Sequence, residues 1–164
     1  MAFVLRPAED GDLTAITAIY NDAVLNTTAI FNEQIRDIDD RRRWIAERTK
    51  RGFPVLVAEE DGVVLGYGSF GDFRPFDGFR YTVEDSVYVA PSSRGRGVAG
   101  ALLARLIEEA QRLGKHVMVA AITADNTLSL RLHARHGFVE SARMPELGYK
   151  FGRWHELVLM QRFL

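Results

Sequence analysis

Residues 86–100 read SVYVAPSSRGRGVAG, and this stretch passes from an apolar segment through a glycine-rich turn into a helical pattern. The free backbone N–H groups at the start of a helix, together with its dipole, favour a bound phosphate. Glycines let the backbone approach phosphate oxygens closely, and Arg94 and Arg96 offer charge-assisted hydrogen bonds. The stretch therefore predicts a strand, a phosphate-binding loop and a helix in immediate succession.

Hydrophobic periodicity around this stretch predicts a mixed α/β chain, with an antiparallel hairpin before the loop and a strand–helix–strand unit after it. The pair Asp61-Gly62 is typical of a hairpin turn. A loop over 71–80 is rich in Gly, Phe, Asp and Arg. The predicted strands are 3–6, 54–59, 63–70, 82–89, 116–122, 138–143 and 153–163, and the predicted helices are 13–24 (capped by Asp10 or Asp12), 41–51 (capped by Asp39 or Asp40), 97–113 and 126–136.

Length and composition predict one domain over residues 1–164. The formal net charge of −1 gives no broad basic field, so we expect neither nucleic acid nor a membrane as a partner. The chain has no cysteine, which excludes disulfides, a cysteine nucleophile and thiolate metal ligands. Its four histidines show no metal-ligand spacing, so we expect no metal site. Neither a signal peptide nor an apolar run of about 18 residues is evident, so a cytoplasmic location is expected.

Two familiar phosphate-binding motifs fit the loop poorly. A Walker loop needs Gly-Lys-Ser or Gly-Lys-Thr, and neither is present. The dinucleotide pattern G-x-G-x-x-G is formally met by Gly95, Gly97 and Gly100. However, residues 91–94 separate it from the strand, and Asp125 lies late for a ribose ligand. A tight turn without a ligand is the structural alternative.

A third pattern, R-x-x-G-x-[GA], is met by Arg94, Gly97 and Ala99, and it resembles the pyrophosphate loop of the GCN5-related N-acetyltransferase (GNAT) family. Residues 126–138, NTLSLRLHARHGF, resemble the second motif of the family, N-x-x-[AS]-x-x-L-[YH]-x-x-x-G-F. The resemblance implies the GNAT fold: α/β (α+β), with a central, mixed, mostly antiparallel twisted sheet flanked by helices. It also implies acetyl-CoA as co-substrate and N-acetyl transfer as the reaction.

Further segments resemble the phosphinothricin and methionine sulfoximine N-acetyltransferase branch of that family; they are residues 19–24, 26–31, 73–76, 82–89 and 150–154. This closer resemblance implies as acceptor the α-amine of a small amino-acid analogue, such as phosphinothricin, methionine sulfoximine or methionine sulfone. Family resemblance also suggests a homodimer. Asp85 departs from the branch, where His is expected. Another amine, such as a peptide N-terminus, a polyamine or an antibiotic, stays open as acceptor, and so does a non-catalytic acyl-CoA-binding module.

The resemblance implies catalytic roles for three residues. Glu84 is the expected general base, the N–H of Val89 is the expected oxyanion donor, and His133 is either the acid for the leaving thiolate or a packing histidine. Strand alternation places Glu84 with Ser86 and Tyr88 on one face. The expected cofactor-binding residues are Val87, Tyr88, Val89, Arg94, Gly95, Arg96, Gly97, Val98, Ala99, Gly100, Asn126 and Ser129.

The acceptor side is expected to hold a carboxylate and a small side chain. Arg74 is the expected carboxylate ligand, because a guanidinium grips a carboxylate with two hydrogen bonds. Aromatic residues of the 71–80 loop and beyond are candidates for the side-chain pocket. The expected substrate-binding residues are Phe31, Phe73, Arg74, Pro75, Phe76, Tyr81, Glu84, Asp85 and Ser86.

Overall fold

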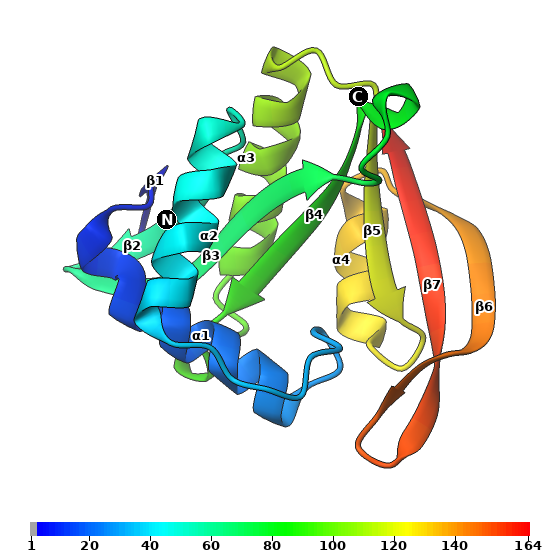
Figure 1. Cartoon of the computed structure of the whole chain (residues 1–164), viewed down its shortest axis with the longest axis horizontal. Helices are drawn as coiled ribbons and strands as arrows, with labels where there is room; N and C mark the ends of the chain where they lie inside the picture. The colour runs from blue at the N-terminus through cyan, green and yellow to red at the C-terminus, as the bar shows by residue number, and fades with distance from the viewer. Residues whose placement is uncertain (1–2) are drawn as a thin grey trace.

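The computed structural model describes residues 3–164, and in this part of the chain a seven-stranded sheet in the order β1-β2-β3-β4-β5-β7-β6 carries helices on both faces (Figure 1). The predicted fold class, a mixed and mostly antiparallel sheet flanked by helices, is confirmed. The strands are β1 (Val4–Pro7), β2 (Val55–Glu60), β3 (Val63–Asp72), β4 (Thr82–Val89), β5 (Val117–Thr123), β6 (Val139–Lys150) and β7 (Arg153–Phe163). The helices are α1 (Leu13–Asn26), α2 (Ile38–Lys50), α3 (Val98–Arg112) and α4 (Thr127–Arg135), with short 3-10 turns at Asp10–Asp12, Asp77–Phe79 and Pro91–Ser93.

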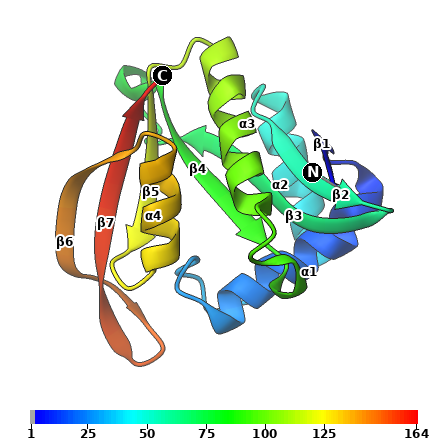
Figure 2. The same cartoon turned by 180° about the vertical axis from the view of Figure 1, so that it is seen from behind.

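The sheet opens between β4 and β5. These two strands are parallel, and their pairing runs only from Thr82↔Val117 to Glu84↔Val119. Every other strand pair is antiparallel, and β4 stays paired with β3 from Val83 to Val89. Past Glu84 the two strands diverge, as both views of the ribbon show (Figures 1 and 2). The divergence leaves one edge of β4 without a strand partner in the middle of the sheet.

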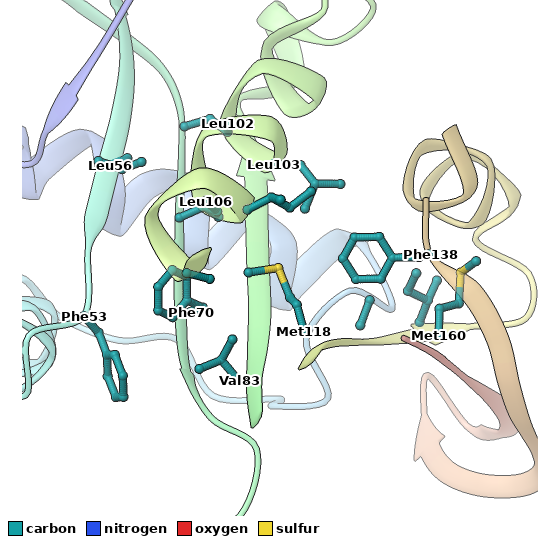
Figure 3. Packing of buried hydrophobic residues seen from close by; sticks show 14 of the residues in the cluster. Phe53, Leu56, Phe70, Val83, Leu102, Leu103, Leu106, Met118, Phe138 and Met160 are labelled. Atoms are coloured by element: carbon teal, nitrogen blue, oxygen red, sulfur yellow. The ribbon is translucent and has the colours of Figure 1, made fainter. Parts of the chain in front are cut away.

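Helix α3 covers one face of the sheet, with α4 beside it (Figure 2). The apolar residues of α3 recur every three or four positions and therefore share one side of the helix. Leu102, Leu103 and Leu106 are completely buried and pack with Phe70 of β3 and Met118 of β5 (Figure 3). Burying one such leucine stabilises the fold by about 1.5–3 kcal/mol. This packing holds the glycine loop, which leads into α3, in a fixed place.

Helices α1 and α2 cover the opposite face (Figure 1). Ile16 and Val24 of α1 pack with Val57 of β2 and Tyr67 of β3 in a second core. Trp44 of α2 meets the ring of Tyr67 edge-on at 6.1 Å between ring centroids. The sheet therefore separates two cores, and the opening between β4 and β5 lies between them.

Most predicted helices and strands are confirmed, with observed bounds that differ from the predicted ones by one to three residues. The bounds of β4 and β7 are as predicted. The hairpin turn is also confirmed, because Asp61 and Gly62 both have positive φ, 51° and 80°. Asp12 stands at the N-cap position of α1 as predicted, although its side chain makes no capping hydrogen bond, whereas the predicted caps of α2, Asp39 and Asp40, are wrong. Asp37 caps α2 by accepting a hydrogen bond from the N–H of Asp40 at 2.7 Å, and Asp12 turns its carboxylate to Arg6 rather than to α1.

The strand predicted over 138–143 continues to Lys150 as β6. The pairing of β6 with β7 jumps from Met144↔Leu157 to Gly148↔His155, and Glu146 has a φ of 52°. This bulge absorbs Pro145, which has no N–H for the ladder. An edge strand tolerates such a break, and β6 is the last strand of the sheet.

Candidate functional site

A cavity of about 1010 Å³ occupies the opening between β4 and β5. It is bounded by both strands, the glycine loop, the start of α3, one side of α4 and the end of α1 with the residues after it. Of the sequence-predicted site residues, the lining includes Glu84, Asp85, Ser86, Val87, Tyr88, Val89, Arg94, Gly95, Gly97, Val98, Ala99, Gly100, Asn126, Ser129 and His133. The structure therefore brings most of the predicted residues to one place.

The backbone of β4 offers hydrogen-bonding groups to this cavity. The N–H of Ala90 donates to Leu65 on the β3 side at 2.9 Å. Because backbone direction alternates along a strand, the N–H groups of Val87 and Val89 point to the other side, where β5 has moved away. Val87 also packs against the α3 core, so it serves both the core and the cavity wall.

The glycine loop has the geometry expected of an anion site. Gly95 and Gly97 have φ values of 78° and 83°, and a Cβ on either would meet open space. Gly97 is the N-cap of α3, and no side chain bonds to the free N–H groups there. A Cβ added to Gly100 would instead make ordinary van der Waals contact with His136 and Leu132, at 3.6 and 3.7 Å. The helix start therefore presents backbone donors to the cavity.

The two arginines of the loop differ in position. Arg94 lines the cavity and pairs with Asp22 of α1 at 3.1 Å, so the pair spans from the loop to α1. Arg96 turns away and pairs with Glu60 of β2 at 2.6 Å. The side chain of Arg96 is not part of the lining, in contrast to the expectation from sequence.

Glu84 lies near the closed end of the opening, where β4 and β5 still pair. Burial and then the nearby charge of Asp85 raise the pKa of its carboxyl, against smaller opposing effects of Arg74 and Arg48. Packing confirms that Glu84 and Tyr88 share one face of β4, as predicted. Tyr88 packs with the core under α1, whereas Val83 and Val87 pack with the core under α3. A carboxylate of raised pKa in a cavity is a candidate general base.

His133 and Asp85 form a buried pair behind β4. Nε2 of His133 lies 3.1 Å from Oδ2 of Asp85, and Nδ1 lies 2.8 Å from the carbonyl oxygen of Ser129. Burial alone lowers the pKa of His133, but the hydrogen bond and charge of Asp85 and the Ser129 carbonyl outweigh it, so the pKa is raised. Both ring nitrogens are therefore engaged, which favours a structural pairing over a free acid.

The second motif begins with a capped helix. Asn126 is the N-cap of α4, and its Oδ1 accepts from the N–H of Ser129 at 3.2 Å. The hydroxyl of Ser129 lies 3.3 Å from Nδ1 of His133. Both side chains therefore shape α4 as well as line the cavity.

Of the expected acceptor residues, only those on β4 are part of this lining. Arg74 folds over the ring of Phe73, with Cζ 4.2 Å from the centroid, and donates to the Phe73 carbonyl. Phe76 and Tyr81 are exposed. Phe31 lies in a smaller hollow of about 370 Å³ beside Tyr149. The cavity residues on β4 are thus confirmed as neighbours, whereas Phe31, Phe73, Arg74, Pro75, Phe76 and Tyr81 lie outside it.

One wall of the cavity depends on a residue whose role the sequence did not reveal. Lys150 of β6 is 1% exposed, and its Nζ donates to the carbonyls of Val24, Thr27 and Ile30 at 2.6, 2.7 and 2.5 Å. These carbonyls lie in the last turn of α1 and in the segment after it. Thr28 adds a hydroxyl contact to Thr123 of β5 at 2.8 Å. The sequence pointed to 150–154 only as a segment that resembles the branch, and the contacts of Lys150 with these carbonyls come from the structure.

Within residues 3–164, no three His, Asp or Glu side chains gather into a group that would hold a metal ion. In the same part of the chain, no helix is long and apolar enough to cross a membrane.

Comparisons with known proteins agree with one another. The family model described as the acetyltransferase (GNAT) family matches residues 16–138. The chain is 57% identical over 157 residues to the L-methionine sulfoximine/L-methionine sulfone acetyltransferase of Salmonella typhimurium, covering 96% of this chain and 92% of that one. It is 43% identical over 162 residues to a phosphinothricin N-acetyltransferase of Alcaligenes faecalis, covering 98% and 82%. The solved structure of Salmonella typhimurium yncA with its cofactor acetyl-CoA superposes with a TM-score of 0.98 at 55% identity, covering 100% and 95%.

Proposed function

Because the chain belongs to the GNAT family of acetyltransferases, we propose that it transfers the acetyl group of acetyl-CoA to the α-amine of a small amino-acid analogue. The acceptor class is that of methionine sulfoximine, methionine sulfone and phosphinothricin, after which the relatives are named. The observation that carries the proposal is the cavity between β4 and β5, which joins a loop with free backbone donors to the half-buried carboxylate of Glu84.

The cavity fits the cofactor named for the relative of known structure. The open space at Gly95 and Gly97 and the free donors of α3 suit a pyrophosphate, with Arg94 adding charge. The unpaired edge of β4 suits the amide-bearing arm of acetyl-CoA. This arm would form hydrogen bonds with the backbone of Val87 and Val89, as a neighbouring strand would. We also assign binding of acetyl-CoA to Tyr88, Asn126 and Ser129 and to the backbone of the other loop residues. The side chain of Arg96, which is paired with Glu60, takes no part in this assignment.

Glu84 is the proposed base. A free α-amine has a pKa of about 7.7–8.0, so removing its proton near neutral pH is a modest task. A carboxylate whose pKa is raised lies closer to that of the amine and accepts the proton more efficiently than an ordinary one. The neutral amine then attacks the thioester carbon, and the N–H of Val89 donates to the carbonyl oxygen as negative charge develops there.

The leaving thiolate needs little help, since a thiol has a pKa of about 8.5. An acid role for His133 is therefore left out of the proposal, because Nε2 faces Asp85 and Nδ1 faces Ser129. We propose Arg74 as the ligand of the acceptor carboxylate, reached when its guanidinium leaves the ring of Phe73. Phe31, Phe73, Pro75, Phe76 and Tyr81 are proposed to close over the acceptor.

We further propose that residues 1–164 form one domain and act as a cytoplasmic homodimer without nucleic acid or membrane partners. Tyr149, Phe151 and Trp154 on the β6–β7 hairpin are each more than half exposed, which supports an interface there. Sedimentation velocity at micromolar concentration tests this proposal, and a monomer of 18.5 kDa would contradict it.

The test of the reaction is thiol release from acetyl-CoA with a panel of acceptors: methionine sulfoximine, methionine sulfone, phosphinothricin, spermidine, an aminoglycoside and a short peptide. Turnover with the first three supports the proposal. Turnover only with another amine would keep the reaction and discard the acceptor class. If no amine is acetylated although acetyl-CoA stabilises the protein against heat, the chain is a binding module or its acceptor lies outside the panel.

A further inference from the structure

Arg48 of α2 lies against the sheet at a glycine. A Cβ added to Gly71 of β3 would overlap the guanidinium of Arg48, so the guanidinium occupies the space that a side chain at Gly71 would fill. Gly71 has no positive φ, and the absence of a Cβ is therefore what this position supplies.

The position of Gly71 matters because its partner in the β3–β4 ladder is Glu84. Directly opposed residues of an antiparallel pair share one face, with Cβ atoms about 4.5–5.5 Å apart. The guanidinium of Arg48 therefore stands where the cross-strand neighbour of Glu84 would otherwise be. Helix α2 thus places a positive charge beside the carboxylate of Glu84, the proposed base.

Arg48 has few other partners. Its Nη1 donates to the carbonyl of Phe70 at 3.2 Å, and its Cζ lies 5.7 Å from the centroid of Trp44. It takes part in no carboxylate ion pair within residues 3–164, unlike Arg51 one turn later, which pairs with Asp72. Burial and then the charge of Arg51 lower the pKa of Arg48, but a guanidinium stays protonated.

The charged groups around Glu84 come from three elements. Asp85 on the same strand opposes ionisation of Glu84, while Arg74 in the preceding loop and Arg48 on α2 favour it. Tyr88 is also near and stays neutral, since burial raises its pKa to about 12. Arg74 is exposed and folded onto Phe73, whereas Arg48 is seated between α2 and β3.

We propose that Arg48 is a positioning residue for Glu84: its guanidinium, seated in place of a side chain at Gly71, keeps the carboxylate of Glu84 ionised and able to accept a proton at neutral pH. This inference rests on the proposed function of Glu84 as the base. Gly71 is part of this arrangement, because any larger residue at this position would displace the guanidinium of Arg48.

The experiment measures the titration of Glu84 in two ways. One is the carboxyl ¹³C shift of Glu84, assigned by its loss in Glu84→Gln, and the other is the acidic limb of kcat/KM for methionine sulfone. The variants are Arg48→Met, Arg48→Lys and Gly71→Ala, and the control is Arg43→Met, which removes an exposed charge from the same helix.

In Arg48→Met we expect the titration midpoint of the Glu84 carboxyl and the acidic limb of kcat/KM to move together to higher pH, because the carboxylate loses a nearby positive charge. The KM for acetyl-CoA and the rate at alkaline pH should stay unchanged. Gly71→Ala should shift the midpoint in the same direction with Arg48 intact, and it covers the case in which Arg48→Met does not fold. Arg48→Lys should restore most of the wild-type profile, and Arg43→Met should not alter it.

Unmoved midpoints in both Arg48→Met and Gly71→Ala would overturn the inference. A second result would also overturn it: Arg48→Met raises the KM for methionine sulfone but leaves the acidic limb where it is. In that case the KM for 3-(methylsulfonyl)propylamine, the same amine without its carboxylate, would not change. That result would make Arg48 a ligand of the acceptor carboxylate. A wild-type protein that acetylates no amine would instead defeat the proposed function, while the ¹³C titration would still decide the coupling of Arg48 to Glu84.

Discussion

His133 of α4 is joined to Asp85 of β4 by a contact of 3.1 Å between Nε2 and Oδ2, and both side chains are almost fully buried. Because Nδ1 of His133 faces a carbonyl, it must carry a proton, and a second proton must lie between Nε2 and the carboxylate. The Nε2 proton therefore ties α4 to β4, while the Nδ1 proton bonds within α4 to the carbonyl of Ser129. The pair connects the helix of the second motif to the strand that carries Glu84.

Replacing Asp85 by Asn should lower stability by about 3 kcal/mol, because it leaves a buried imidazole without its counter-charge. The pKa of His133 is raised in the folded state, so its contribution is complete below pH ~6.5 and is lost as pH rises through the raised value. The gap between wild type and Asp85→Asn should therefore narrow from pH 6 to pH 9. Urea unfolding at both pH values measures this gap.

A matched control for that variant is Asp125→Asn, since Asp125 forms a half-exposed pair with Arg153. An exposed pair contributes about 0–1 kcal/mol, so this variant should change stability little. A constant gap between Asp85→Asn and wild type at all pH values would contradict a charged pair.

Glu84→Gln should lower kcat/KM by about 10²–10⁴-fold while acetyl-CoA binding stays unchanged, because the amide cannot accept the proton of the amine. In the wild type, the pKa of Glu84 is raised by burial and Asp85, so the acidic limb should lie above the range of an ordinary glutamate. Steady-state kinetics from pH 5 to pH 9 measure both effects. Full activity of Glu84→Gln at neutral pH would exclude Glu84 as the base.

Gly95→Ala should raise the KM for acetyl-CoA about tenfold or more. The reason is that the loop backbone must both hold a φ of 78° at this residue and approach the phosphates. An alanine in this left-handed conformation costs about 1–2 kcal/mol. Gly114→Ala is the matched control. Gly114 has a φ of 66° and open space around it at the other end of α3, outside the cavity.

Calorimetry should show a similar loss of stability for both glycine variants, with the loss of cofactor affinity confined to Gly95→Ala. Equal acetyl-CoA affinities for the two variants would remove the loop from the cofactor site.

Lys150→Met should lower the free energy of unfolding by about 3 kcal/mol and the Tm by about 6–12 °C, because three carbonyls lose a charged donor inside the protein. It should also loosen the segment 26–29, which walls the cavity, and hydrogen exchange of those amides should accelerate. Lys50→Met, at the exposed end of α2, is the control. Unchanged exchange at 26–29 would mean that the wall holds without Lys150.

The glycine loop shows why so much could be predicted from sequence. A strand, a turn that needs positive φ, and an apolar helical repeat follow one another within residues 86–112, and each is a local property of the chain. The two motifs carry the family resemblance, which the family match confirms. The assignment of Gly97 followed from the first motif, and those of Glu84 and Val89 from the resemblance of the strand before it; all three residues line one cavity.

Other features depend on contacts between distant residues. The strand predicted over 138–143 continues as β6 through a bulge at Pro145, because its partner β7 supplies the register. Phe73 and Arg74 were expected at the cavity, but they pack on each other in the loop. Lys150 belongs to a segment that resembles the branch, but only the approach of α1 to β6 brings three carbonyls to its Nζ.

The sequence by itself thus determined the order of the elements, the glycine loop before α3 and the choice of Glu84 as the candidate base, because these depend on neighbours along the chain. Only the tertiary structure decided which charges face them. Asp85 meets His133 across 48 positions, and Arg48 reaches the place opposite Glu84 because Gly71 has no side chain. Such pairings arise from the packing of helices on a twisted sheet, which brings together residues that local patterns treat as unrelated.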